Sequence, residues 1–398
     1  MTTTMLGFSH YRCYSNSRIV CFLNHYAGTN RFNSTSSSTG LLSRQFILSH
    51  PATVDIPSST HPKVLVKGSR DSSIGISGEK SKDARGRIVC ITSGKGGVGK
   101  TTTAASFGMG LAQLGFKTCL VDFDIGLRNL DIHLGLERRV IFDFVNVLLG
   151  ECNLHQALIK HKSSTTSSVS TASSTSTIAG GESFLYLLAA SQTRDKESLT
   201  VEGVETILDQ LSQMFDYVVL DSPAGIESGA RHAMYFAVDA IIVTNPELSS
   251  CRDADKMVGF ISSRSRRAEV AGINSSSSST NEDRNSLLAV PSCLPVRQSL
   301  LVTRYDPIRV QAEESLSLQD MKELLGLPIV GVIPESKSIL TCTNLGQPVI
   351  SQVDKGDIAA LAYSDMVQRY LGHTDLALRF LTPPPEPSLL ERIFNLKK

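Results

Sequence analysis

Short apolar runs recur along the chain between residues 87 and 333, and segments with helical spacing separate several of them. The first run, Arg87 to Ser93, is rich in β-branched residues, and Lys100 to Leu114 follows with apolar residues at helical spacing. The further runs are Thr118 to Phe123, Phe184 to Ala189, Tyr217 to Asp221, Ala240 to Thr244, Ser299 to Thr303 and Ile329 to Ile333. These runs have too many consecutive apolar residues for strands with one face exposed to solvent. They predict a doubly wound α/β fold, a mainly parallel sheet with helices on both faces.

The N-terminal segment has a different pattern. Its first 50 residues carry Arg12, Arg18, Arg31 and Arg44, many Ser, Thr and Asn, and no Asp or Glu. This composition is typical of an organelle transit peptide, and the alternative is a tail without a targeting role. We therefore assign residues 1–85 to a transit peptide and linker. The interleaved Phe, Tyr, Leu and Arg favour a mitochondrial address, with the plastid stroma as the alternative.

Two stretches inside the remaining chain look like surface insertions. They lie near residues 162–181 and 271–295 and consist largely of Ser, Thr and other small or polar residues. Neither can bury enough apolar surface to offset its ordering entropy. We expect both to be disordered loops inserted into one domain at residues 86–381.

Composition narrows the classes of function. The chain is 41% apolar and 19% charged, which is enough to build a sizeable core. A net charge of +1 gives no overall field for nucleic acid or anionic lipid, so any such affinity is local. The eight cysteines are scattered singly, without a C-x-x-C pair, which argues against a zinc ribbon or a disulfide scaffold and favours a reducing compartment. No run approaches the roughly 18 consecutive apolar residues of a spanning helix.

The stretch ITSGKGGVGKTTT, Ile91 to Thr103, carries the chemistry. Gly94 to Thr101 fits the P-loop spacing G-x-x-x-x-G-K-[ST], between a predicted strand and a predicted helix. In this pattern Lys100 reaches the β/γ-phosphates, and Thr101 supplies a hydroxyl to Mg²⁺. The residues that approach the phosphates through their backbone are Gly94, Gly96, Gly97 and Gly99.

Acidic residues end two of the predicted strands. Asp122 and Asp124 close one strand, and we expect Asp124 to orient the attacking water, with Asp122 as an open alternative. Asp221 ends an apolar run of the Walker B form and is predicted to hold Mg²⁺ directly or through water. For each of these acids the alternative is a carboxylate that caps a turn.

A second lysine, Lys95, stands early in the same loop. Phosphoryl transfer gains from an extra cation near the γ-oxygens, supplied in cis or by a partner. From its position Lys95 could enter the site of a second subunit, which predicts an ATP-dependent homodimer. The alternative is a solvated loop lysine.

The C-terminus has an amphipathic pattern after the proline-rich stretch Thr382 to Pro387. At 100° per residue, the apolar residues fall within an arc of about 160°. These residues are Leu389, Leu390, Ile393, Phe394 and Leu396. We predict that residues 382–398 form a linker and a membrane-surface helix, basic at its end; the alternative is a helix packed on the domain's own core. One copy should bind weakly, and two copies in a dimer gain avidity.

These motifs resemble a known family. Lys95 to Thr102, KGGVGKTT, is similar to the deviant Walker A motif of the class that contains MinD, ParA and nitrogenase iron proteins. Within that class, further runs resemble the MinD family from about Arg87 to Lys398, apart from the two inserts. Examples are DFDIGLRNLD (Asp122 to Asp131), DSPAGIESGA (Asp221 to Ala230), LVTRYDP (Leu301 to Pro307) and GVIPE (Gly331 to Glu335).

The resemblance implies roles for individual residues. It places Lys95 across the dimer, Asp124 in switch I near the metal, and Asp221 in switch II. Val98, Lys100, Thr101 and Thr102 would bind the phosphates of ATP, with Mg²⁺ at Thr101. Asn245 and Pro334 stand where adenine contacts are expected.

The resemblance also implies a biological role. The chain would be a Mg²⁺-dependent ATP hydrolase, stimulated by dimerisation, that binds an anionic membrane through its C-terminal helix and positions an organelle's division site. A MinE-like activator and a MinC-like inhibitor would be its partners, and no specific nucleic acid is expected. The residues of these motifs resemble the proteobacterial form of the family more than the plant plastid form. That supports a mitochondrial location, on the matrix side and peripheral to the inner membrane.

Two other functions are considered. A ParA-like DNA segregation ATPase would need a basic surface, and the only candidate is Arg264, Arg266 and Arg267. A solvated helix face explains that cluster equally well, and the C-terminal helix argues against DNA. An iron–sulfur carrier would need cysteines that meet at a dimer axis or in C-x-x-C. It ranks last.

Overall fold

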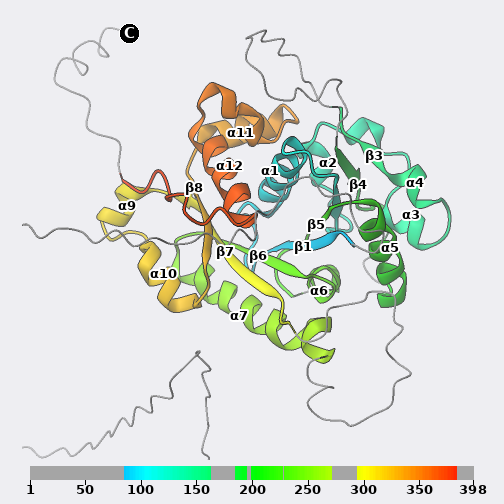
Figure 1. Ribbon diagram of the computed structural model, residues 1–398, viewed down its shortest axis with the longest axis horizontal. Helices are drawn as coiled ribbons and strands as arrows, with labels where there is room; N and C mark the ends of the chain where they lie inside the picture. The colour runs from blue at the N-terminus through cyan, green and yellow to red at the C-terminus, as the bar shows by residue number, and fades with distance from the viewer. Residues whose placement is uncertain (1–84, 163–183, 195–198, 227, 271–293, 383–398) are drawn as a thin grey trace, which may run out of the picture. The chain divides into compact units, whose positions relative to one another are not determined.

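The part of the chain that the structure describes contains one sheet, with the first strand near its middle (Figure 1). The structure, a computed structural model, describes residues 85–162, 184–194, 199–226, 228–270 and 294–382. The sheet order is β3-β4-β2-β5-β1-β6-β7-β8. The strands are β1 (Arg87–Thr92), β2 (Thr118–Asp122), β3 (Ile159–Lys160), β4 (Leu185–Leu188), β5 (Tyr217–Asp221), β6 (Asp239–Thr244), β7 (Arg297–Tyr305) and β8 (Ile329–Pro334). All neighbours pair in parallel except β3 with β4.

The predicted mainly parallel sheet is therefore confirmed, and each predicted strand is present with bounds close to those expected. The short edge strand β3 was not predicted, because two residues are too few to show a period. Its antiparallel pairing with β4 closes the sheet beyond β4.

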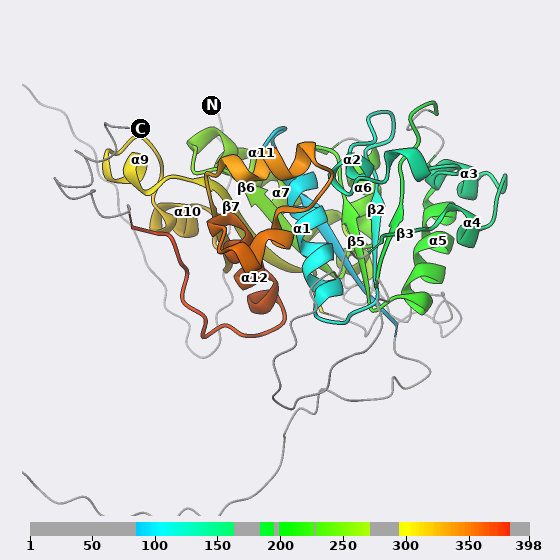
Figure 2. The ribbon, with the colours of Figure 1, turned by 90° about the horizontal axis from the view of Figure 1, so that it is seen from above.

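Helices cover both faces of the sheet, as Figures 1 and 2 show. One face carries α1 (Lys100–Gln113), α2 (Leu130–His133), α11 (Lys337–Asn344) and α12 (Ile358–Tyr370); the other carries α5 (Val201–Met214), α6 (Ser228–Tyr235), α7 (Leu248–Arg264) and α10 (Leu318–Leu325). The shorter helices are α3 (Phe144–Leu148), α4 (Leu154–Ala157) and α9 (Pro307–Gln311), with 3₁₀ segments η1 (Glu137–Arg139) and η4 (Val349–Lys355).

The two helical layers explain why the middle positions of the central strands are apolar on both faces. In β1, Ile88 and Cys90 join the core under α5, α6 and α7, whereas Val89 and Ile91 join the core under α1 and α12. Successive side chains of a strand point to opposite faces. A strand buried on both sides therefore has no solvent-facing position for a polar residue.

Helix α1 lies close against the sheet and fixes the loop before it. A Cβ added at Gly108 would lie 2.6 Å from Cδ2 of Leu120 in β2, so only glycine permits this approach. Phe107 is fully buried, and its ring meets that of Tyr370 in α12 edge-on at 4.9 Å between centroids. The middle of α1 is thus held between the sheet and α12.

An ion cluster around one buried carboxylate joins the strands at the end of the sheet opposite that loop. Asp239, only 1% exposed, lies at the first position of β6. It accepts hydrogen bonds from Arg297 Nε at 2.9 Å, Arg87 Nη2 at 2.9 Å and the Tyr370 hydroxyl at 2.6 Å. Burial raises the pKa of Asp239, but these hydrogen bonds and charges outweigh it and leave the pKa lowered.

Several predicted segments lie outside the described residues. They are the transit peptide and linker up to residue 84, the greater part of both Ser-rich inserts, and the C-terminal helix with Leu389, Leu390, Ile393, Phe394 and Leu396. These predictions stay predictions. In the residues that the structure does describe, no helix has both the length and the apolar character that crossing a bilayer requires.

Candidate active site

The glycine-rich loop connects β1 to α1 at the carboxyl end of the central strand. Gly97 and Gly99 have positive φ angles of 75° and 97°, a region that L-residues with a Cβ seldom occupy. An added Cβ at Gly96, Gly97 or Gly99 would meet no atom within 4 Å. The loop is therefore open on its outer side, where a phosphate chain can approach the backbone amides.

Gly94 has a different role in the same loop. A Cβ at this position would lie 2.3 Å from the backbone carbonyl of Asp253 in α7. This glycine lets the loop rest directly on α7. The sequence explains Gly94 as part of a motif, and the structure adds the close contact with α7.

Lys100 and Ser93 tie the two ends of the loop together. Lys100 Nζ donates to Ser93 Oγ at 2.9 Å, and Ser93 Oγ donates to the carbonyl of Lys95 at 2.7 Å. Burial lowers the pKa of Lys100, while the charges of Asp221 and Asp124 oppose that effect. The lysine thus lies over the loop near two carboxylates, and its phosphate role stays a prediction.

Asp221 and Asp122 lie side by side, in register on β5 and β2. The Asp221 carboxylate is hydrogen-bonded by the Thr101 side chain, and its Oδ1 has no partner among the described residues although it is buried. Burial, followed by the charge of Asp122, raises the pKa of Asp221 well above its usual range. A buried carboxylate oxygen without a partner, beside a hydroxyl, fits a divalent cation.

Asp122 holds the backbone that follows β2. Its Oδ1 accepts the amide of Asp124 at 2.9 Å, and its Oδ2 accepts the amide of Leu130 at 3.2 Å. Burial raises the pKa of Asp122 to about 7, against the effect of these two bonds. Asp122 therefore shapes the loop that carries the half-buried Asp124. The choice of Asp124 as the water-orienting residue stays a prediction.

Lys95 points toward α7 of its own chain. Its Nζ lies 2.8 Å from Glu247 Oε2 and 3.4 Å from Ser249 Oγ, and its side chain is 42% exposed. The lysine is thus at the surface and held by an exposed ion pair. Its role across a dimer is neither supported nor contradicted by this geometry.

Thr303, which the sequence did not single out, links the loop to the predicted adenine contacts. Its Oγ1 lies 2.7 Å from the carbonyl of Val98 and 3.0 Å from Oδ1 of Asn245. Asn245 is 6% exposed and directly follows β6, and Pro334 ends β8 in register with Tyr305. The signal that could have found Thr303 is its polar hydroxyl near the end of an apolar strand.

His133 is a second residue that the sequence did not single out. Its Nε2 lies 3.3 Å from Oγ1 of Thr102, and its Nδ1 lies 3.0 Å from the carbonyl of Asn129. Since a carbonyl only accepts, Nδ1 carries the proton and Nε2 accepts from Thr102. Burial lowers the pKa of His133, which favours this neutral form.

Comparison with known proteins gives the family. The family model described as "AAA domain" matches residues 86–270. The septum site-determining protein MinD of Escherichia coli (strain K12) is 46% identical over 310 residues, which cover 78% of this chain and 99% of that protein.

Two solved structures give the same picture. The MinD cell division protein of Aquifex aeolicus has a TM-score of 0.55 and 32% identity, covering 74% of this chain and all of that one. The MinC:MinD complex of the same organism has a TM-score of 0.53 and 35% identity, covering 72% of this chain and 96% of that one. This chain belongs to the MinD family of septum site-determining ATPases, within the ParA/MinD class of P-loop proteins.

Proposed function

We propose that this chain hydrolyses ATP with Mg²⁺, dimerises when ATP is bound, attaches to an anionic membrane, and positions the division site of an organelle. ATP would bring two subunits together and so pair their C-terminal helices. Hydrolysis would separate the subunits and release them from the membrane. Nucleotide, dimer and membrane would then form one switch.

The observation that carries the proposal is the arrangement of Lys100, Thr101 and Asp221 beside the open glycine loop. In this proposal Lys100 binds phosphate, and Thr101 and Asp221 hold Mg²⁺; the Lys100–Ser93 bond and the buried Asp221 oxygen without a partner among the described residues support these roles. The metal would supply charge neutralisation on the phosphate oxygens. Asp124 would orient water, and Asn245 and Pro334 would contact adenine.

The proposed dimer depends on Lys95. Its pair with Glu247 is exposed, so the lysine can leave it at small cost, because exposed ion pairs contribute about 0–1 kcal/mol. It would then reach the γ-phosphate of a second subunit, where an added cation raises the rate. The hydrolysis rate would accordingly rise with protein concentration.

Two partner classes follow from the family. The Aquifex aeolicus neighbour is a complex of MinC with MinD, which supports a MinC-like partner for this chain as well. We extend the proposal to a MinE-like activator of hydrolysis.

The experiment is co-sedimentation of the full chain with anionic liposomes in ATP and in ADP. The matched variant ends after Pro387 and so lacks the amphipathic segment. Recovery with vesicles in ATP only, lost in the truncated variant, would support the switch. Equal recovery in both nucleotides, or no effect of the truncation, would contradict the membrane role.

The subcellular location of the protein is a separate proposal. We propose that residues 1–85 direct the protein to the mitochondrial matrix, where it lies on the inner membrane. Fusion of these residues to a fluorescent protein tests this directly. Fluorescence in plastids would establish the alternative address, and diffuse fluorescence would contradict any transit peptide.

The basic cluster that the DNA-binding alternative requires is partly engaged in contacts within the chain. Arg266 lies 2.5 Å from Glu205 Oε1, and Arg267 donates to the carbonyl of Leu294 at 3.1 Å. Two of the three arginines of the candidate basic cluster are thus engaged within the chain. Arg264 lines a pocket instead.

A further inference from the structure

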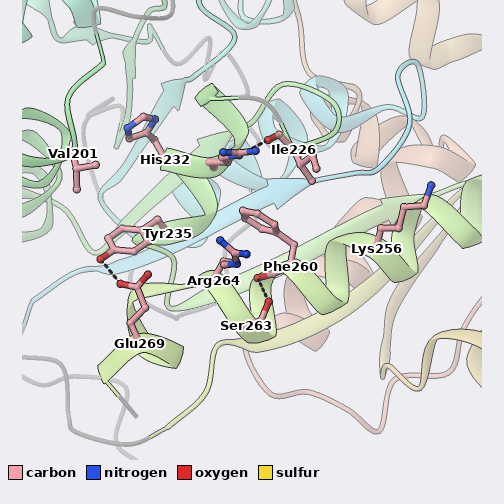
Figure 3. Close-up of a pocket in the computed structure, with 10 residues that line it drawn as sticks. Val201, Ile226, His232, Tyr235, Lys256, Phe260, Ser263, Arg264 and Glu269 are labelled. Carbon is pink, nitrogen blue, oxygen red and sulfur yellow. Dashed lines mark hydrogen bonds between the residues drawn. The ribbon is translucent and has the colours of Figure 1, made fainter. Parts of the chain in front are cut away.

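A pocket of about 600 Å³ lies on the helical face formed by α6 and α7 (Figure 3). Its walls include Arg231 and Tyr235 from α6 and Lys256, Phe260 and Arg264 from α7. On each helix these residues lie four positions apart, so they share one face. From Lys256 to Arg264 the face extends about 12 Å, at 1.5 Å per residue.

The pocket is strongly biased toward positive charge. Among its lining residues, Arg231, Lys256 and Arg264 stand against the single carboxylate of Glu269. Lys256 also forms an exposed ion pair with Asp253 at 2.9 Å, which a ligand carboxylate would have to replace at small cost. That carboxylate is already bonded, because the Tyr235 hydroxyl donates to its Oε2 at 2.8 Å. Arg264 makes no hydrogen bond or ion pair within the described parts of the chain. Its guanidinium is therefore available to a ligand.

Other side chains of the pocket are held in place. Arg231 Nε donates to the carbonyl of Ile226 at 2.7 Å, which leaves its two terminal nitrogens for other partners. His232 Nδ1 lies 2.8 Å from the carbonyl of Ser228. Both donors thus keep their positions without a ligand, which lowers the entropy cost of binding.

We propose that this pocket binds an acidic peptide segment of a partner protein, with carboxylates at Arg231, Lys256 and Arg264 and an apolar side chain on Tyr235 and Phe260. Arginine binds carboxylates through paired N–H groups. The two aromatic rings offer apolar surface beside those cations, and Figure 3 shows Tyr235 and Phe260 on either side of Arg264. The proposal is independent of the membrane and division roles proposed above.

The shape of the site favours a peptide over a small anion. Small ligands bury most of their surface in an enclosed cavity, whereas Lys256 here is 74% exposed and the cations are spread along two helices. A peptide can engage such dispersed charges at once. A single phosphate cannot.

The pocket is also connected to the nucleotide site through the loop after β5. Arg231 holds Ile226, and the neighbouring Gly225 donates its amide to the carbonyl of Ser93 at 3.0 Å. Ser93 in turn accepts from Lys100. A peptide bound at Arg231 therefore contacts a loop that touches the glycine loop.

The test uses the full chain and a fluorescein-labelled peptide, Glu-Glu-Leu-Glu-Glu-Phe-Glu, followed by fluorescence anisotropy at low salt. Arg264→Glu should weaken binding about tenfold or more, because it removes one attraction and adds a repulsion, a difference of about 1.4 kcal/mol. Lys256→Glu, at an exposed position, should act in the same direction and provides a variant with little risk to folding. Binding should also fall as salt increases.

Two controls decide the outcome. Arg309→Glu, an equal charge change on α9 outside the pocket, should leave the affinity unchanged, and a peptide with Gln in place of Glu should not bind. Equal affinity in all variants would overturn the proposal. Binding of anionic vesicles or inorganic phosphate that is lost in Arg264→Glu, without peptide binding, would also overturn it and assign the pocket to that ligand.

Discussion

The clearest test of the site's electrostatics is the substitution Asp122→Asn in the metal-free and nucleotide-free protein. Asp122 is fully buried next to Asp221, and burial raises its pKa from 3.8 to about 7. Its raised pKa means that the ionised form is less stable in the folded than in the unfolded chain. The contribution of Asp122 to the free energy of unfolding is therefore largest at low pH and is lost as the pH rises through about 7.

The magnitude follows from the two pKa values. With 3.8 in the unfolded chain and about 7 in the fold, wild-type stability should fall by about 3 kcal/mol between pH 5 and pH 8 through this residue alone. Asparagine does not ionise, so the stability of the variant lacks this dependence on pH. It also replaces one acceptor by a donor facing the amide of Asp124 or Leu130, at a cost of about 1–3 kcal/mol that does not vary with pH.

The assay is urea unfolding of wild type and Asp122→Asn at pH 5 and pH 8, with EDTA present. The variant should be the less stable protein at pH 5, and the difference should shrink or reverse at pH 8. The decisive quantity is how much the stability difference between wild type and variant changes from pH 5 to pH 8. The cost of the lost hydrogen bond is the same at both pH values and therefore cancels from this change. A difference that stays constant across this range would refute the reasoning and show that Asp122 is ionised at pH 5.

Three further substitutions test the framework of the site. Gly94→Ala should lower stability by about 1–3 kcal/mol in thermal denaturation, because its Cβ would lie 2.3 Å from the carbonyl of Asp253. The control is Gly259→Ala, which should not lose stability because its Cβ would meet no atom within 4 Å. Asp239→Asn should cost about 1–3 kcal/mol in urea at pH 7, because two half-exposed arginines lose their charged hydrogen-bond partner. The loss should diminish in acid, where the wild-type carboxylate protonates. A neutral effect at pH 7 would contradict the cluster's importance. Thr303→Val leaves a glycine-loop carbonyl without its bond. It should cost about 1–3 kcal/mol and weaken binding of a fluorescent ATP analogue, and unchanged affinity would exclude a role in shaping the loop.

The sequence predicted those parts of the molecule that depend on local pattern. The strands were visible because Ile88, Val89, Cys90 and Ile91 are all apolar, and a sheet covered on both faces requires that. The glycine loop was visible because its residues are consecutive and follow the fixed spacing of the P-loop motif.

The contacts that the sequence could not predict join residues far apart in the chain. Thr303 bonds to Val98 across 205 positions, and Lys95 pairs with Glu247 across 152. No periodicity carries information about such pairs, because they result from the order of strands in the sheet. The roles of Asp122 and Asp124 were left open for a related reason: which of two nearby acids accepts backbone amides depends on the turn after β2.

Lys95 and Lys100 show how position within one loop separates two lysines of the same chemistry. Lys100 is at the first position of α1 and 9% exposed, so its charge is directed inward to Ser93 and Asp221. Lys95 lies before the turns at Gly97 and Gly99 and is directed outward to Glu247. An inward lysine can serve only the site of its own chain. An outward lysine in an exposed ion pair is free to change partners at small cost, which is the property that a residue acting in a second subunit would need.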